Sequence, residues 1–250
     1  MNQTTRLGIL LSAILTAPLA HAADVRMGFG LSLIPYVIQE SNSGFELEIF
    51  REALAFKGHV LKPVYVAQKA MPQMLKEKKL DAAQRGSPDL AEDAGVYYAS
   101  QPAVVYEDYA VSLKKNKLAI NTMADLKGKS IAAFMTAKQF LGPEYAAAVQ
   151  DNPKYQEVAT SKRQVLMLYS GGIDVLICDA NIFKYTRDAE KGQVDISPEV
   201  TYHKIFNHTP LKSNNPVFAD KQVRDDFDAG LAELKRSGKY QKIIAKYVKD

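Results

Sequence analysis

The sequence predicts an α/β protein made of two lobes. Short apolar runs, typical of buried strands, alternate with longer stretches whose apolar residues recur every three or four positions, as on one face of a helix. This alternation favours parallel sheets covered by helices. It occurs in the first half of the chain and again after residue 126, and hydrophobic residues make up 47% of the 250 residues. We therefore expect two similar α/β units, each with its own core.

The first 22 residues have the features of a secretory signal peptide. Arg6 provides a charged start, an apolar stretch runs from Leu7 to Leu15, and Ala20-His21-Ala22 forms a small-x-small cleavage site. The apolar stretch is far shorter than the roughly 20 residues that cross a bilayer, so we do not expect a membrane anchor. We predict export to the periplasm, with residues 23–250 as the mature chain.

Composition excludes several classes of protein. The single cysteine, Cys178, cannot form a disulfide within the chain, so the fold must be stabilised by its core in an oxidising compartment. The net charge is +4, but the lysines are scattered, whereas a nucleic-acid-binding protein needs a basic patch. We expect a monomer that binds a small molecule, without nucleic acid, metal or cofactor.

The first unit begins with a strand at Val25–Phe29 and a loop that contains Pro35. Ser43 and Glu46 have the spacing of a capping box, and apolar residues follow at helical spacing up to Leu54. Three further elements are expected before residue 84: a strand over 60–66, a helix over 69–78 and a strand over 80–83.

The second unit repeats this order. After Gly128, a strand is expected over 130–134, and Thr136 with Gln139 forms a second capping box before a helix that runs to Ala148. The remaining expected elements are a helix opened by the capping box Ser161–Gln164, a buried strand over 173–179, and two C-terminal helices within 220–249 that Gly238 separates.

Six short segments occur in a characteristic order along the mature chain. They are Gly44–Glu48, Leu75–Ala82, Ser100–Pro102, Asp125–Lys129, Gly172–Asp174 with Asp179, and Leu231–Tyr240. In this order and at these spacings they resemble the bacterial extracellular solute-binding proteins of family 3, periplasmic receptors for polar amino acids. The resemblance implies a periplasmic-binding-protein-like (type II) clamshell, in which two hinge crossings join two α/β lobes. Lobe 1 would comprise residues 23–112 and 207–250, and lobe 2 residues 113–206.

The resemblance also implies how a ligand is held. Receptors of this family pair the ligand carboxylate with an arginine and its ammonium with an aspartate of the second lobe, because a desolvated zwitterion needs both charges paired. Asp179 matches that aspartate. The position of the arginine is occupied by Asp93, and that of an aromatic residue by Leu33. The chain thus departs from the family pattern where the ligand carboxylate binds, which leaves the ligand class open.

Arg85 follows a predicted strand, at the edge where α/β sheets bind ligands. We predict that it replaces the missing arginine and holds a carboxylate or another anion. Pro88 biases Ser87 toward an extended backbone, which would present its hydroxyl or amide beside Arg85. In the alternative, Arg85 only fixes its loop by pairing with Asp89, Glu92 or Asp93.

The other candidates also have two interpretations each. The free amides at Thr136 could hold an anion, or this residue only caps its helix. Asp179 either binds the ligand cation or caps the segment after its strand. Tyr36 either lines the cleft or is a packing residue with one polar end, and Leu33 could form an apolar wall. The predicted ligand-binding residues are therefore Leu33, Tyr36, Arg85, Ser87, Thr136 and Asp179.

The predicted function is capture of a small polar or charged solute between two lobes for an ABC transporter, whose membrane subunit would sense the closed form. One alternative is a periplasmic enzyme on the same scaffold, similar to dehydratases of cyclic carboxylic acids, with Asp179 or Tyr98 as general acid or base. Another is a sensor or interaction protein without a transporter. The segment Gly28-Phe29-Gly30 lacks the third glycine of a dinucleotide-binding motif.

Overall fold

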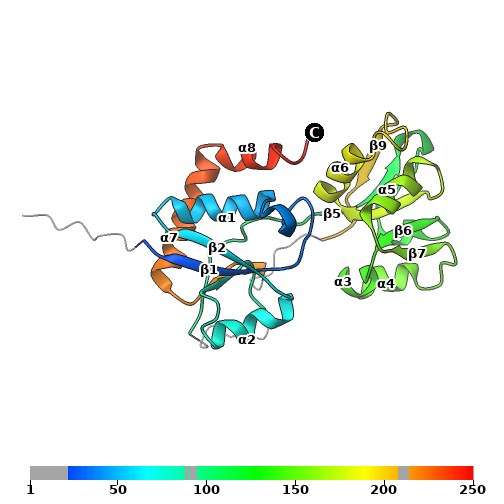
Figure 1. The fold of residues 1–250 in the computed structure, drawn as a ribbon. Helices are drawn as coiled ribbons and strands as arrows, with labels where there is room; N and C mark the ends of the chain where they lie inside the picture. Colours follow the sequence, from blue (N-terminus) through cyan, green and yellow to red (C-terminus); the bar gives the residue numbers. More distant parts are fainter. Residues whose placement is uncertain (1–21, 88–89, 91–94, 208–213, 250) are drawn as a thin grey trace, which may run out of the picture.

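Two α/β lobes make up the protein, as the sequence predicts (Figure 1). The structure, a computed structural model, describes residues 22–87, 90, 95–207 and 214–249. Residues 1–21 of the predicted signal peptide lie outside the described residues. None of the helices in the described ranges combines the length and the apolar character that a membrane span requires.

The sheet of lobe 1 has the strand order β2-β1-β3-β10-β4. β1 (Asp24–Phe29) pairs in parallel with β2 (Val60–Tyr65) and β3 (Ala82–Ala83). β10 (Val217–Phe218) inserts antiparallel between β3 and β4 (Tyr97–Tyr98). The chain therefore leaves lobe 1 after β4 and returns to its sheet through β10.

Helices of lobe 1 pack closely against each other. They are α1 (Phe45–Ala55), α2 (Met71–Lys76), α7 (Lys221–Arg236) and α8 (Lys239–Ala245). Phe50 of α1 stacks on Phe227 of α7 with 5.2 Å between ring centroids. A Cβ atom added to Gly230 of α7 would overlap the carbonyl oxygen of Ala53 in α1. Glycine is thus required for the approach of these two helices.

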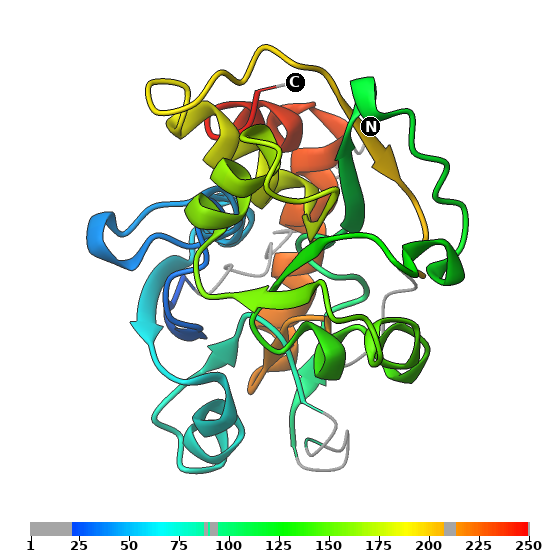
Figure 2. The same cartoon turned by 90° about the vertical axis from the view of Figure 1, so that its right-hand side faces the viewer.

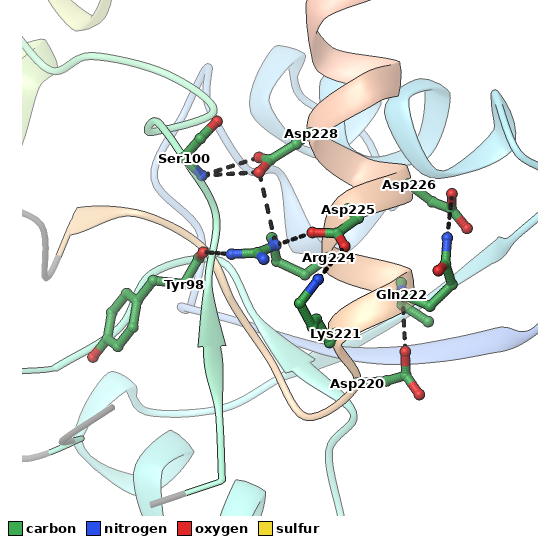
Figure 3. A network of polar contacts seen from close by, with 10 residues as sticks. Tyr98, Ser100, Asp220, Lys221, Gln222, Arg224, Asp225, Asp226 and Asp228 are labelled. Atoms are coloured by element: carbon green, nitrogen blue, oxygen red, sulfur yellow. Dashed lines mark hydrogen bonds and ion pairs between the residues drawn. The ribbon is translucent and has the colours of Figure 1, made fainter. Parts of the chain in front are cut away.

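Polar contacts attach the first turns of α7 to the end of β4 and to the chain that follows it (Figure 3). Arg224 donates one hydrogen bond to the carbonyl of Tyr98 at 2.6 Å and another to the carboxylate of Asp225 at 2.7 Å. Both carboxylate oxygens of Asp228 accept from the amide of Ser100 at 3.1 Å. Because Ser100 leads toward lobe 2, these contacts fix the point at which the chain leaves lobe 1.

The sheet of lobe 2 has the order β7-β6-β8-β5-β9, with β6 parallel to β7 and β8, and β5 antiparallel to β8 and β9. Its strands are β5 (Asp108–Leu113), β6 (Ile131–Phe134), β7 (Tyr155–Val158), β8 (Val175–Asp179) and β9 (Val200–His203). Its helices are α3 (Ala137–Phe140), α4 (Pro143–Val149), α5 (Ser161–Tyr169) and α6 (Ala180–Ala189). In the view of Figure 2, lobe 2 lies nearer to the reader, with part of lobe 1 behind it.

The lobe boundary predicted at residue 112 lies within β5. β5 begins at Asp108 and pairs with strands of lobe 2, so the first crossing ends before it. The second crossing lies between His203 and Val217, and residues 208–213 of it are outside the described residues. The single helix predicted up to Ala148 is interrupted before Pro143, which has no amide hydrogen to continue α3.

The three predicted capping boxes are absent. α1 is preceded by Gly44, which has a φ of 113° and no side chain to cap with, while Glu46 is buried and bonded elsewhere. Thr136 has a left-handed backbone and does not cap α3 through its side chain. The N-cap of α5 is Thr160, whose hydroxyl accepts from the amide of Arg163. The helices exist nonetheless, because their apolar faces are buried.

Candidate functional site

A cavity of about 500 Å³ lies between the two lobes. This volume suits a small solute. Its polar and charged lining residues are Glu46, Gln84 and Arg85 from lobe 1, Tyr106, Asn207 and Asn214 from the crossings, and Asp108 and Glu144 from lobe 2. We call it the cleft cavity.

A second cavity of about 350 Å³ lies in lobe 1 and is lined in part by residues 30–33 and 67–68. Glu46, Gln84, Arg85 and Tyr106 line both cavities, so these four side chains lie between the two spaces. Both cavities thus meet at the residue that the sequence singles out, Arg85.

Arg85 follows β3 and lies over an aromatic ring. Its guanidinium carbon is 4.7 Å from the ring centroid of Tyr106, a favourable cation–π distance. Burial lowers the pKa of Arg85, but Tyr106 and Glu46 raise it by more, so the side chain stays charged. Within the described ranges it forms no ion pair. The loop carboxylates proposed as its alternative partners, Asp89, Glu92 and Asp93, lie outside the described residues.

Glu46 is a buried carboxylate that the sequence did not identify as part of the site. It lies in the first turn of α1, is 2% exposed, and accepts a hydrogen bond of 2.6 Å from the Tyr106 hydroxyl. Burial raises the pKa of Glu46, and Arg85 and the Tyr106 hydroxyl oppose this effect. The sequence signal that could have found Glu46 is a carboxylate between two apolar residues, Phe45 and Leu47, at a helix start. All three residues are buried in the structure.

Replacing Tyr106 with phenylalanine should destabilise the protein by about 1–3 kcal/mol at pH 8, because Glu46 loses its only hydrogen-bond donor among the described residues. The raised pKa of Glu46 would rise further. The loss should therefore be smaller at pH 4, where Glu46 is largely protonated in the folded and the unfolded state, and should grow with pH. Thermal unfolding at both pH values measures it. The exposed Tyr97→Phe is the control, and equal losses at pH 4 and pH 8 would contradict this role.

Asp108 is the first residue of β5 and lines the cleft cavity. It is 9% exposed. Burial, together with the charge of Asp179 on the neighbouring strand, raises the pKa of Asp108 to about 7. No local pattern identifies this residue, because its surroundings depend on the pairing of β5 with β8.

Asp179 joins the two lobes and caps α6. Its Oδ1 accepts from the amides of Asn181 and Ile182, each at 2.9 Å. Its Oδ2 accepts from the Tyr36 hydroxyl at 2.8 Å and from the amide of Glu107 at 2.9 Å. These four donors match the four lone-pair sites of a carboxylate. Asp179 is 5% exposed and lines neither cavity, so the structure gives it the capping role that the sequence left as the second interpretation.

Tyr36 is fully buried and is the packing residue with a polar end that the sequence allowed. Its ring stacks on Tyr106 with centroids 4.4 Å apart, and its hydroxyl accepts from the Asn181 side chain at 3.0 Å while donating to Asp179. We call the contact between Tyr36 and Asp179 the interlobe clasp, since it connects lobe 1 to the start of α6 in lobe 2.

Leu33 lines one of the two cavities, whereas Ser87 lines neither. Leu33 is half-exposed and lines the cavity of lobe 1 together with Arg85. Ser87 is half-buried and lines neither cavity, and its carbonyl accepts from the Tyr98 hydroxyl at 3.2 Å. A Cβ atom on Gly86 would overlap the Tyr98 ring, so this glycine makes room for a tyrosine rather than for a ligand.

Thr136 is separated from the other candidates. It lines a surface hollow of lobe 2 that Arg85 does not reach. Its amide donates to the carboxylate of Glu157 at 2.7 Å, and the amide of Lys138 donates to the other oxygen at 3.1 Å. A carboxylate of the protein itself thus occupies the amides that were predicted to hold an anion.

Comparisons with known proteins agree with this architecture. The sequence profile of the bacterial extracellular solute-binding proteins, family 3, matches residues 25–250. An L-arginine-binding protein from Pseudomonas aeruginosa is 25% identical over 263 residues, which cover 99% of this chain and 96% of that protein.

Solved structures extend the likeness to the fold. The second substrate-binding domain of GlnP from Lactococcus lactis, in an open conformation, has a TM-score of 0.64 at 18% identity and covers 90% of this chain and 95% of its own. The GluR0 ligand-binding core in complex with L-glutamate has a TM-score of 0.62 at 14% identity. The match covers 92% of this chain and 100% of the GluR0 chain. The predicted periplasmic-binding-protein-like fold is confirmed.

Proposed function

Since this chain belongs to the bacterial extracellular solute-binding proteins of family 3, we propose that it captures an amino acid or a closely related zwitterion between its lobes. The observation that carries this proposal is Arg85, a charged side chain that lines the cleft cavity and has no ion-pair partner among the described residues. A guanidinium suits the two oxygens of a carboxylate. The arginine-binding relative from Pseudomonas supports the same ligand class.

Apolar side chains at the edges of the two lobes support a closing motion. Leu31 in lobe 1 is 62% exposed, and Phe140 in lobe 2 is 67% exposed. Leu31 lines the lobe 1 cavity and Phe140 the cleft cavity. Bringing the lobes together around a ligand would remove apolar surface of this kind from water and so favour the closed form.

The setting we propose follows from the family. The protein would be exported by the signal peptide of residues 1–22 to the periplasm, where the closed form would deliver its solute to the membrane subunits of an ABC transporter. Family and relative are both named for binding, so we propose capture without chemical change of the solute. A solute recovered unaltered after incubation with the protein would agree with this.

A thermal-shift screen of the purified exported protein against L-arginine, L-lysine, L-glutamine and L-glutamate tests the proposal. A ligand at 100 times its dissociation constant should add about 2.7 kcal/mol to the free energy of unfolding, which raises Tm by several degrees. Arg85→Gln should weaken binding of the best ligand by about 10- to 150-fold, as expected for loss of a charge-assisted hydrogen bond.

Arg163→Gln, an exposed arginine of lobe 2 away from both cavities, is the matched control and should bind like the wild type. The proposal fails if none of the four amino acids raises Tm, or if Arg85→Gln binds as tightly as the control.

A further inference from the structure

We propose that Asp108, rather than Asp179, receives the positively charged nitrogen of the ligand. This inference rests on the proposed function, since it assigns a second residue to the same cleft cavity. Asp108 and Arg85 line that cavity from lobe 2 and lobe 1. One supplies a carboxylate and the other a guanidinium, as a zwitterion bridging the lobes requires.

The Asp108 side chain has no hydrogen-bond donor within the described ranges of the chain. More than nine-tenths of this residue is removed from solvent, yet its side chain accepts no hydrogen bond from any described residue. Its carboxylate oxygens are not among the fully buried atoms that lack a partner, so they keep access to the cavity. A largely desolvated carboxylate normally has hydrogen-bond partners. The carboxylate borders the cleft cavity, so a ligand there could supply the missing N–H donors.

Asp179 on the neighbouring strand differs from Asp108 because its carboxylate already accepts hydrogen bonds within the protein. Asp108 lies directly opposite Asp179 in the pairing of β5 with β8, and Asp179 already has four donors. A ligand ammonium could reach Asp179 only by displacing donors of the protein. At Asp108 it would displace none.

The negative charge around Asp108 also favours a cation at this place. The titratable groups that act on Asp108 or are acted on by it are Asp179 and the buried thiol of Cys178 on β8, and the buried hydroxyl of Tyr145 on α4. None of these is a cation, and within the described ranges Asp108 forms no ion pair. A positively charged ligand group would therefore offset an excess of negative charge.

A dependence on pH follows from this placement. In the empty cleft, burial and the charge of Asp179 raise the pKa of Asp108 to about 7, so the residue is about half protonated at neutral pH. A bound cation favours the ionised form and lowers the pKa again, so binding near pH 7 releases about half a proton per site. Affinity for the cationic ligand should therefore be about tenfold higher at pH 8 than at pH 6.

Isothermal titration calorimetry with L-arginine and L-glutamine, at pH 6 and pH 8 and in two buffers of different ionisation enthalpy, tests the inference. For the wild type we expect tighter binding at pH 8 and release of about half a proton per site near pH 7. Asp108→Asn, which keeps the shape of the side chain, should bind at least tenfold more weakly at pH 8 and should lose both the proton release and the dependence on pH.

Asp151→Asn, an exposed carboxyl of lobe 2 outside the cavities, is the control and should behave like the wild type. If Asp108→Asn binds as tightly as the control and with the same pH dependence, the inference is wrong while the proposed function stands. If the wild type binds neither probe at either pH, both the proposed function and this inference are contradicted.

Discussion

Replacing Asp179 with alanine is expected to lower the free energy of unfolding by about 2–4 kcal/mol. The substitution removes the cap of α6, typically about 1 kcal/mol, and leaves the Tyr36 hydroxyl and the Glu107 amide without their acceptor at about 1–3 kcal/mol for a buried group. Burial raises the pKa of Asp179, so the cost of burying its charge offsets part of this loss. Urea unfolding of wild type and variant at pH 7 measures the difference.

Two further variants separate the cap from the interlobe clasp. Tyr36→Phe keeps the cap and removes the clasp together with the hydrogen bond from the Asn181 side chain, and it should cost less than Asp179→Ala. In a double-mutant cycle, the two substitutions should show a coupling energy of about 1 kcal/mol, because they remove the same hydrogen bond. A loss below about 1 kcal/mol for Asp179→Ala would show that this carboxylate stabilises neither the start of α6 nor the interlobe clasp.

Gly230→Ala is expected to destabilise the protein by more than about 3 kcal/mol and to lower Tm by roughly 6–12 °C. In an ordinary helix, alanine is more favourable than glycine by about 1 kcal/mol, so the sign of the effect is itself diagnostic. Here the new methyl group would overlap the Ala53 carbonyl, and α7 would have to move away from α1. This would disturb the stacking of Phe50 on Phe227.

Gly192→Ala is the matched control, since the space around this glycine is open and its backbone is unstrained. It should change the free energy of unfolding by less than about 0.5 kcal/mol. Differential scanning calorimetry of both variants provides the comparison. An unchanged or higher Tm for Gly230→Ala would contradict the close approach of α1 and α7.

The parts of the fold that the sequence predicted are those with long periodic patterns. Strands β1, β2, β6 and β8 and the paired C-terminal helices follow from apolar runs and from the break at Gly238. β4 and β10 have two residues each, too few for a pattern, and they exist because neighbouring strands offer them partners. The boundary predicted at residue 112 falls inside β5, whose place in the lobe 2 sheet depends on its pairing with β8 and β9.

The site was predictable only where a local feature revealed it. Arg85 stands out as a charge directly after a strand, and the structure places it at the cleft cavity. Glu46 meets Tyr106 and Asp108 only through folding, because Tyr106 lies 60 positions after Glu46 in the chain. The partner of Asp179 is likewise remote, because the Tyr36 hydroxyl comes from a residue 143 positions away.

The partition between the cleft cavity and the cavity of lobe 1 consists of four side chains, those of Glu46, Gln84, Arg85 and Tyr106. Side chains change rotamer far more readily than a sheet changes its register. If the ligand occupies the cleft cavity as proposed, we expect a single substitution at this partition, at Gln84 for instance, to change the ligand lengths that are bound while both sheets stay intact.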